Sequence, residues 1–185
     1  MSLVDRVFLT WDHAATAAAR MRAVELPVKL LFVCLGNICR SPTAEAVMRH
    51  LVEEAGITDE VEIESAGTGS WHIGHEPDER SAAAAAARGI EMTGKARQVS
   101  EADFYHYDLV LAMDGMNFED LVALAPDAEA ESKVHLLREF DPESTDGDLD
   151  VPDPYYGGAR GFDDVLDMVD AACRGLLDQV LAPER

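Results

Sequence analysis

The sequence contains few cysteines. Its 185 residues include three, Cys34, Cys39 and Cys173, an odd number without a repeated spacing. Such a set is unlike a disulfide framework and is typical of proteins in a reducing compartment, so we expect a cytoplasmic protein. The six histidines do not extend these cysteines into a CxxC or HxxxH pattern. We therefore expect no metal site and no cofactor.

Basic residues and long apolar runs are also scarce. Lys and Arg number 15 against 36 Asp and Glu, which gives a formal net charge of -21 and, without a basic patch, repels nucleic acids. No apolar run reaches the roughly 18 residues of a membrane span. Asp12 and His13 interrupt the N-terminal segment, which therefore lacks the apolar centre of a signal peptide. We expect neither a nucleic acid nor a membrane as a partner, and no pattern indicates an oligomeric state.

Length and composition favour one domain. A chain of this length with 48% hydrophobic residues can bury a sizeable core. Residues 1–26 lie outside the main pattern, and we expect an N-terminal extension that is either helical through its Ala-rich run (14–20) or loosely attached. Residues 27–185 form the predicted domain.

From Val28 onward, apolar runs typical of buried strands alternate with segments of helical periodicity. Strands are predicted at 28–33, 61–67, 107–114 and 132–137, and helices at 43–55, 78–90, 116–124 and 161–181. This alternation predicts a single α/β domain with an open, mainly parallel four-stranded sheet and helices on both faces. Ligands of such sheets bind beyond the carboxyl ends of the strands, where Cys34 and Asp114 both fall.

The stretch "CLGNICRS", residues 34–41, marks the exit of the first strand into a helix. Backbone N–H groups and the helix dipole converge at such an exit, which predicts a phosphate-binding loop. Gly36 and Asn37 tolerate the positive φ that a tight loop needs, and Pro42 suits the first helical turn. The loop therefore has the composition of an oxyanion site.

Cys34 and Arg40 add chemistry to this loop. A positive concavity favours the thiolate of Cys34, which is the nucleophilic form. The planar guanidinium of Arg40 matches phosphoryl oxygens, and the Ser41 hydroxyl can donate a hydrogen bond to the thiolate. The alternative is that Cys34 is a small buried hydrophobe at a strand end. The surrounding residues favour phosphoryl transfer through a cysteinyl phosphate.

Two distant motifs carry a family resemblance. "VCLGNICRSPTAEAV" together with "DPYYGG" resembles the low-molecular-weight protein tyrosine phosphatases, and "KARQVSEADF" and "LAMD" lie between them in the family's order. The resemblance covers residues 28–182. It implies Cys34 as nucleophile, Arg40 as phosphate clamp and Asp153 as general acid, with Asn37 and Ser41 holding the loop and the thiolate. The phosphate-binding residues that it implies are Leu35, Gly36, Asn37, Ile38, Cys39 and Arg40.

Asp153 also has a physical rationale. A phenol is a poor leaving group, so a carboxylic acid that protonates its oxygen contributes about 10²- to 10⁴-fold. The resulting carboxylate can then activate water against the cysteinyl phosphate. The alternative is an Asp-Pro turn in the acidic loop from 141 to 156.

The walls of the site determine its substrate. Tyr155, Tyr156 and Trp71 form the predicted aromatic groove for a phosphotyrosyl ring, although Trp71 also suits a core position. In family members that act on phosphoarginine, the position of Ile38 is typically threonine, so Ile38 favours an aryl phosphate. Phosphotyrosine-containing proteins are the expected partners.

The other two cysteines differ in their expected roles. Cys39 resembles the second cysteine of the family, which forms a reversible disulfide with the nucleophile, and a purely structural thiol is the alternative. Cys173 lies on the apolar face of the last predicted helix, where we expect core packing.

Several supporting positions follow from the resemblance. Some family members carry a histidine before "KARQ" that joins a serine and the loop asparagine. This sequence has Gly94 there and Ser65 as the matching serine, so we expect a shorter or water-filled network. Asp114 either orients Arg40 and the loop or caps the following helix. His72 and His75 are expected at the surface.

The sequence thus predicts a metal-independent protein tyrosine phosphatase. One alternative is a thioredoxin-coupled arsenate reductase, which has the same fold and loop but needs further thiols. The chain has no cysteine between Cys39 and Cys173, which disfavours that chemistry. The other alternative is a phosphate-binding regulatory module without turnover.

Overall fold

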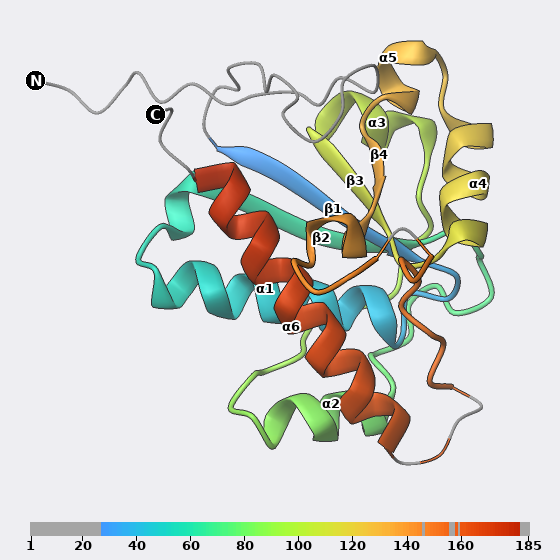
Figure 1. The fold of residues 1–185 in the computed structure, drawn as a ribbon. Coiled ribbons are helices and arrows are strands. Elements are labelled where there is room, and N and C mark those ends of the chain that lie inside the picture. The colour runs from blue at the N-terminus through green and yellow to red at the C-terminus, as the bar shows by residue number, and fades with distance from the viewer. Residues whose placement is uncertain (1–26, 146, 156–157, 159, 182–185) are drawn as a thin grey trace, which may run out of the picture.

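A parallel sheet lies at the centre of the structure, a computed structural model that describes residues 27–145, 147–155, 158 and 160–181 (Figure 1). Its strands are β1 (Val28–Cys34), β2 (Val61–Gly67), β3 (Leu109–Ala112) and β4 (Val134–Leu136). They lie in the order β2-β1-β3-β4 and pair in parallel throughout. The predicted four-stranded open sheet is confirmed. The extension predicted at 1–26 lies outside the described residues.

The helices follow the predicted alternation with two additions. They are α1 (Arg40–Glu54), α2 (Glu79–Ala86), α3 (Glu101–His106), α4 (Gly115–Leu124), α5 (Ala128–Glu131) and α6 (Arg160–Leu181), with the 3-10 turns η1 (Thr58–Glu60) and η2 (Leu137–Phe140). The sequence did not predict α3 and α5, because six and four residues are too few to show a helical period. Both begin at local caps, a capping box at Ser100 and the side chain of Asp127.

α1 begins three residues earlier than predicted. The carbonyl of Cys39 accepts hydrogen bonds from the Thr43 N–H (3.1 Å) and the Thr43 hydroxyl (2.8 Å). Pro42 lies inside this first turn, where a missing N–H costs nothing. The helix therefore starts directly at Arg40, which is also the last residue of the predicted phosphate-binding loop.

Two hydrophobic layers enclose the sheet. Leu30 and Phe32 of β1 pack into the layer of α1 and α6, while Leu31 and Val33 pack into the layer of α3, α4 and α5. Alternate residues of a strand point to opposite faces, and all four are buried. Burial on both faces explains the near-continuous apolar run of this strand.

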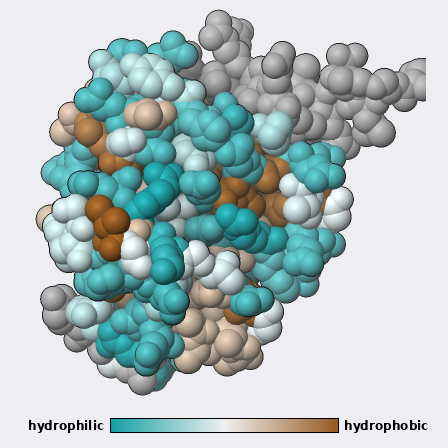
Figure 2. Space-filling view, turned by 180° about the vertical axis from the view of Figure 1, so that it is seen from behind, coloured by the Kyte–Doolittle hydropathy of each residue, from teal (hydrophilic) through white to brown (hydrophobic). Residues whose placement is uncertain are grey.

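The outer surface reflects the charge of the chain. On the face shown in Figure 2, hydrophilic residues predominate and hydrophobic ones form separate patches. Within the described part of the chain, no helix is long and apolar enough to cross a membrane.

The contact between α6 and η2 depends on Gly175. A Cβ at this position would lie 1.9 Å from the Phe140 carbonyl oxygen. We expect Gly175→Ala to lower the free energy of unfolding by about 1–3 kcal/mol, because the clash outweighs the better helix propensity of alanine. Urea denaturation measures the change.

Gly161→Ala in the same helix is the matched control, because its Cβ would meet its nearest neighbour at an ordinary 3.6 Å. We expect no loss of stability in this variant. Equal unfolding free energies for the two variants would contradict the proposed clash.

Candidate active site

Residues 34–40 curl into a loop between β1 and α1. Asn37 has a φ of 53°, in the left-handed region that asparagine tolerates. The chain after β2 supports this loop, since the Gly69 N–H donates to the Leu35 carbonyl (2.8 Å). At Gly67, a Cβ would lie 2.8 Å from the Leu35 carbonyl oxygen. This close approach requires glycine at that strand end.

Hydrogen-bond donors surround the sulfur of Cys34. The Asn37 N–H donates to Sγ (3.2 Å), and the Ser41 hydroxyl lies 3.1 Å from Sγ. The Ser41 oxygen accepts from Nδ2 of Asn37 (2.9 Å), so its own proton remains for Sγ or for the Ala66 carbonyl (3.1 Å). Donors in this arrangement stabilise a thiolate.

Arg40 is buried at the base of the site, where its guanidinium binds two carboxylates. It is 3% exposed, and its Nη1 donates to Asp114 and to the Val151 carbonyl (3.1 Å). Its Nη2 donates to Oδ2 of Asp153 (3.2 Å). Burial opposes its charge, but Cys34, Asp114 and Asp153 outweigh burial and raise the pKa of Arg40 above its usual value. The guanidinium is thus held charged beside Cys34.

Asp114 has both of the roles that the sequence left open. Its Oδ2 accepts from Arg40, and its Oδ1 accepts from the Asn117 N–H (2.7 Å) as the N-cap of α4. The carboxylate therefore holds the Arg40 guanidinium and starts the next helix at the carboxyl end of β3.

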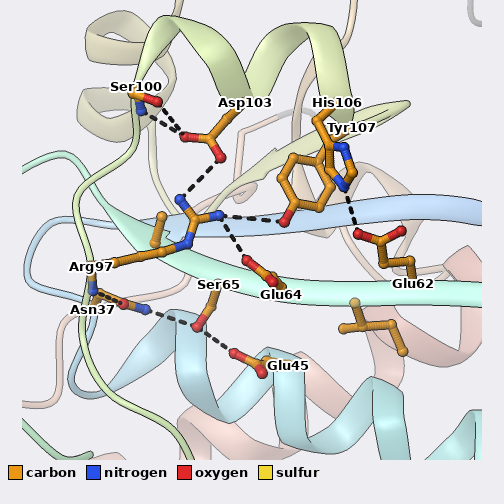
Figure 3. A network of polar contacts seen from close by, with 12 residues as sticks. Asn37, Glu45, Glu62, Glu64, Ser65, Arg97, Ser100, Asp103, His106 and Tyr107 are labelled. Atoms are coloured by element: carbon orange, nitrogen blue, oxygen red, sulfur yellow. Dashed lines mark hydrogen bonds and ion pairs between the residues drawn. The ribbon is translucent and has the colours of Figure 1, made fainter.

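A polar network behind the loop orients Asn37 (Figure 3). Nδ2 of Asn37 donates to the Ser65 hydroxyl (2.8 Å), which donates to Oε2 of Glu45 (2.6 Å). Oδ1 of Asn37 accepts from the Arg97 N–H (2.9 Å). A carboxylate can only accept, so Glu45 fixes the direction of the hydrogen bonds along this network. Glu45 was not among the predicted site residues, although its position four residues after Ser41 places both on one helix face.

The side chain of Arg97 extends the network to α3. Its guanidinium pairs with Glu64 (3.1 Å) and Asp103 (3.0 Å), and it lies 3.5 Å from the Tyr107 hydroxyl (Figure 3). Asp103 also accepts from the Ser100 N–H at the start of α3 (2.7 Å). The backbone that supports Asn37 is thereby anchored to a helix on the opposite face of the sheet.

The network ends beside an opening at Gly94. A pocket of about 250 Å³ is bordered by Gly94, Ser65 and Glu45. Gly94 has a φ of 96°, and a Cβ there would have no neighbour within 4 Å. On its side toward this pocket, the Ser65 hydroxyl donates to Glu45, and whether the network expected at Gly94 is shorter or water-filled stays a prediction.

One pocket of about 270 Å³ brings the predicted chemistry together. Its lining residues are Cys34, Leu35, Gly36, Ile38, Cys39, Arg40, Trp71, His72, Asp153 and Tyr155. Trp71 is 63% exposed and Tyr155 37%, so both rings lie at the rim and Trp71 is not a core residue. The predicted groove residue Tyr156 lies outside the described residues.

His72 differs from the surface position expected for it. It is half-buried, it lines the pocket, and a Cβ on Gly36 would lie 3.0 Å from its Cδ2. Its Nδ1 is buried and lacks a hydrogen-bond partner among the described residues. The turn after Trp71 folds the ring back onto the loop, a long-range contact that the local pattern did not indicate. His75 is exposed as predicted.

The other two thiols are buried. Burial raises the pKa of Cys39 to about 12, so Cys39 stays protonated at neutral pH. Cys173 is fully buried in α6 with the core packing that was predicted, and burial raises its pKa as well. Among the described residues, no group of three His, Cys, Asp or Glu side chains is arranged to hold a metal ion.

Comparison with known proteins agrees with this arrangement. The family model for low molecular weight phosphotyrosine protein phosphatase matches residues 29–184. The chain belongs to this family. The low-molecular-weight phosphatases are phosphoric monoester hydrolases, so the domain is that of an enzyme.

Individual phosphatases of the family are similar over most of the chain. The low molecular weight protein-tyrosine-phosphatase of Streptomyces coelicolor is 51% identical over 152 residues, which cover 82% of this chain and 93% of that protein. A crystal structure of an Entamoeba histolytica protein tyrosine phosphatase with Hepes in the active site has a TM-score of 0.77 at 39% identity, covering 81% and 94% of the two chains. The arginine phosphatase of Drosophila has a TM-score of 0.78 at 32% identity, covering 85% and 100%. The shared fold therefore leaves the choice of substrate to the side chains of the pocket.

Proposed function

We propose that this phosphatase hydrolyses phosphotyrosine in proteins through a cysteinyl-phosphate intermediate. The observation that supports this function best is the meeting of three side chains in one pocket. A nucleophile (Cys34), a cation (Arg40) and a carboxyl group (Asp153) border the same space. The chemistry needs these three groups and no metal.

In the first step, the Cys34 thiolate attacks phosphorus and the bond from phosphorus to the phenolic oxygen breaks. Arg40 and the backbone N–H groups of the loop hold the other phosphoryl oxygens. Asp153 gives its proton to the departing phenolic oxygen, so that tyrosine leaves as a neutral phenol. The contact of Arg40 with Asp153 is exchanged for contacts with the phosphoryl group when substrate binds.

In the second step, the Asp153 carboxylate takes a proton from water while the water oxygen attacks phosphorus. The bond between phosphorus and sulfur breaks, which returns Cys34 as thiolate and releases inorganic phosphate. The Ser41 hydroxyl, 3.1 Å from Sγ, stabilises the charge that develops on the leaving sulfur.

The rim of the pocket favours a phosphorylated phenol. Trp71 and Tyr155 offer aromatic faces to the ring of a phosphotyrosine, and Ile38 adds an apolar wall. We expect cytoplasmic proteins as substrates, in keeping with three cysteines that are all free thiols.

Cys173 argues against the arsenate reductase alternative. Its sulfur is fully buried in α6 and lies 3.9 Å from the Ala44 carbonyl oxygen. A thiol in this position cannot reach an arsenylated Cys34 without opening the core.

Replacing the nucleophile tests the proposal. We expect the reduced wild-type protein to hydrolyse para-nitrophenyl phosphate in the presence of EDTA, and Cys34→Ser to lose this activity while still binding phosphate. A phosphotyrosine peptide should be cleaved and a phosphoserine peptide of the same sequence should not, because phosphoserine lacks the ring. Equal turnover by Cys34→Ser would disprove the cysteinyl mechanism, and no turnover by wild type would favour the binding module.

Replacing the acid gives a second prediction. Asp153→Ala should lower kcat/KM by about 10²- to 10⁴-fold for aryl phosphates with high-pKa phenols and much less for those with low-pKa phenols. The reason is that a good leaving group departs without a proton. A series of substituted phenyl phosphates measures this dependence, and an equal loss across the series would rule out the acid role.

We also propose that Cys39 protects the nucleophile. Peroxide oxidises the Cys34 thiolate to a sulfenic acid, and the Cys39 thiol then displaces water to form a disulfide that dithiothreitol reduces. Burial raises the pKa of Cys39 to about 12, so its sulfur attacks as its proton passes to the departing hydroxyl of the sulfenic acid, which leaves as water. Wild type treated with peroxide should regain most of its activity with dithiothreitol, whereas Cys39→Ser should regain little. Equal recovery would leave Cys39 with a structural role only.

A further inference from the structure

We propose that Arg80 is a positioning residue that ties the segment carrying Asp153 to the phosphate-binding loop. The proposal deepens the proposed function and rests on Asp153 acting as the general acid. Arg80 lies in the first turn of α2 and is not one of the residues that line the active-site pocket. It therefore acts through its neighbours rather than on the substrate.

One edge of the Arg80 guanidinium is linked to the phosphate-binding loop through Asp78. Its Nε and Nη2 donate to the two carboxylate oxygens of Asp78 (3.0 and 2.9 Å), a bidentate pair. Asp78 is the N-cap of α2, and its own N–H donates to the Ile38 carbonyl in the loop (2.8 Å). Arg80 is thus two bonded steps from the phosphate-binding loop.

The rest of the guanidinium holds the segment after Asp153. Nη1 donates to the Tyr155 carbonyl (3.1 Å). The guanidinium carbon lies 5.1 Å from the centre of the Tyr155 ring and 4.7 Å from that of Phe162 in α6. Arginine makes these contacts together because its planar group can stack on rings while its edges donate hydrogen bonds.

Tyr155 passes this restraint to the acid. Its N–H donates to Oδ1 of Asp153 (3.0 Å). On the other side, the Val151 N–H donates to the carbonyl of the residue directly after β3 (2.7 Å). Pro152 and Pro154 flank the acid and have fixed φ angles, which reduces the number of conformations open to this span. Asp153 therefore stands between an anchor at Val151 and an anchor at Tyr155.

Loss of the second anchor should affect the acid more than the nucleophile. The loop contacts of Cys34 and the Asp114 contact of Arg40 do not pass through Arg80. Phosphate binding and attack should remain, while protonation of the leaving group becomes less efficient. The loss of rate should therefore be larger for poor leaving groups than for good ones. A general loss of structure would lower the rate for all leaving groups alike.

The experiment compares Arg80→Ala and Arg80→Lys with Arg88→Ala as the matched control. Arg88 also ties the region of α2 to α6, through Asp167 (2.6 Å) and Asp163 (3.9 Å), but neither it nor these partners line the active-site pocket. kcat/KM is measured for phenyl phosphates whose phenols range from low to high pKa. Thermal melting and the dissociation constant for inorganic phosphate are measured for every variant.

We expect Arg80→Ala to lose about tenfold in kcat/KM with phenyl phosphate and less than about threefold with the best leaving group, since only part of the acid's contribution is lost. Arg80→Lys keeps the charge and serves as a second variant in case Arg80→Ala does not fold. It should also lose more kcat/KM with poor leaving groups than with good ones. Arg88→Ala should match wild type throughout. An equal loss for all leaving groups, or none, would overturn the positioning role.

A double variant separates this proposal from the proposed function. In the Asp153→Ala background, Arg80→Ala should cost no further rate on phenyl phosphate, because the group that it positions is gone. A full additional tenfold loss would overturn the proposal while leaving the acid role intact. If Asp153→Ala itself showed no leaving-group effect, the acid role would fail and this inference with it.

Discussion

The buried charge of Arg40 is the constraint on which the site depends. Removing a guanidinium from water costs several kcal/mol unless hydrogen bonds and opposite charges replace the lost solvent. Here Asp114, Asp153 and the Val151 carbonyl provide those partners. These partners come from the end of β3 and from the loop before α6, whereas Arg40 belongs to α1. Satisfying its one charge therefore brings three distant parts of the chain together. The topology assists, because β1 and β3 are neighbours whose carboxyl ends meet.

The nucleophile and the acid are supported in different ways. The loop around Cys34 is held from behind by Asn37 and by the network through Ser65 to Glu45. Asp153 lies in the loop before α6, with 41% of its side chain exposed, and it is held by Arg40 and by the Tyr155 N–H. A firmly held Cys34 beside a more exposed Asp153 suits the proposed reaction, in which Cys34 attacks phosphorus and Asp153 meets both a phenol and water.

Much of this arrangement could be predicted from sequence. Apolar runs and helical periods indicated the order of strands and helices, and two motifs named Cys34, Arg40 and Asp153, which the fold does bring together. Such features are local, because a strand, a helix or a tight loop leaves its pattern in neighbouring residues. The roles of Cys34 and Asp153 in turnover stay predictions until the variants are measured.

What the sequence did not indicate depends on contacts between distant residues. Glu45 has the spacing of an ordinary helical glutamate, and its bond to Ser65 exists because β2 passes beside α1. His72 was expected at the surface, yet its turn places it against Gly36. The stacking of Arg80 on Tyr155 joins residues 75 positions apart. Only the packing of the elements creates these pairs.

The composition of α1 has a mechanical consequence. Arg40, Ser41 and Glu45 all belong to this one helix, and most of its inward face is buried against the sheet and α6. The helix sets their backbone spacing, so a substitution that displaced α1 would disturb the Arg40 guanidinium, the hydroxyl beside Sγ and the end of the network together. The packing of one helix against the sheet thus underlies both the position of Arg40 and the support of the loop.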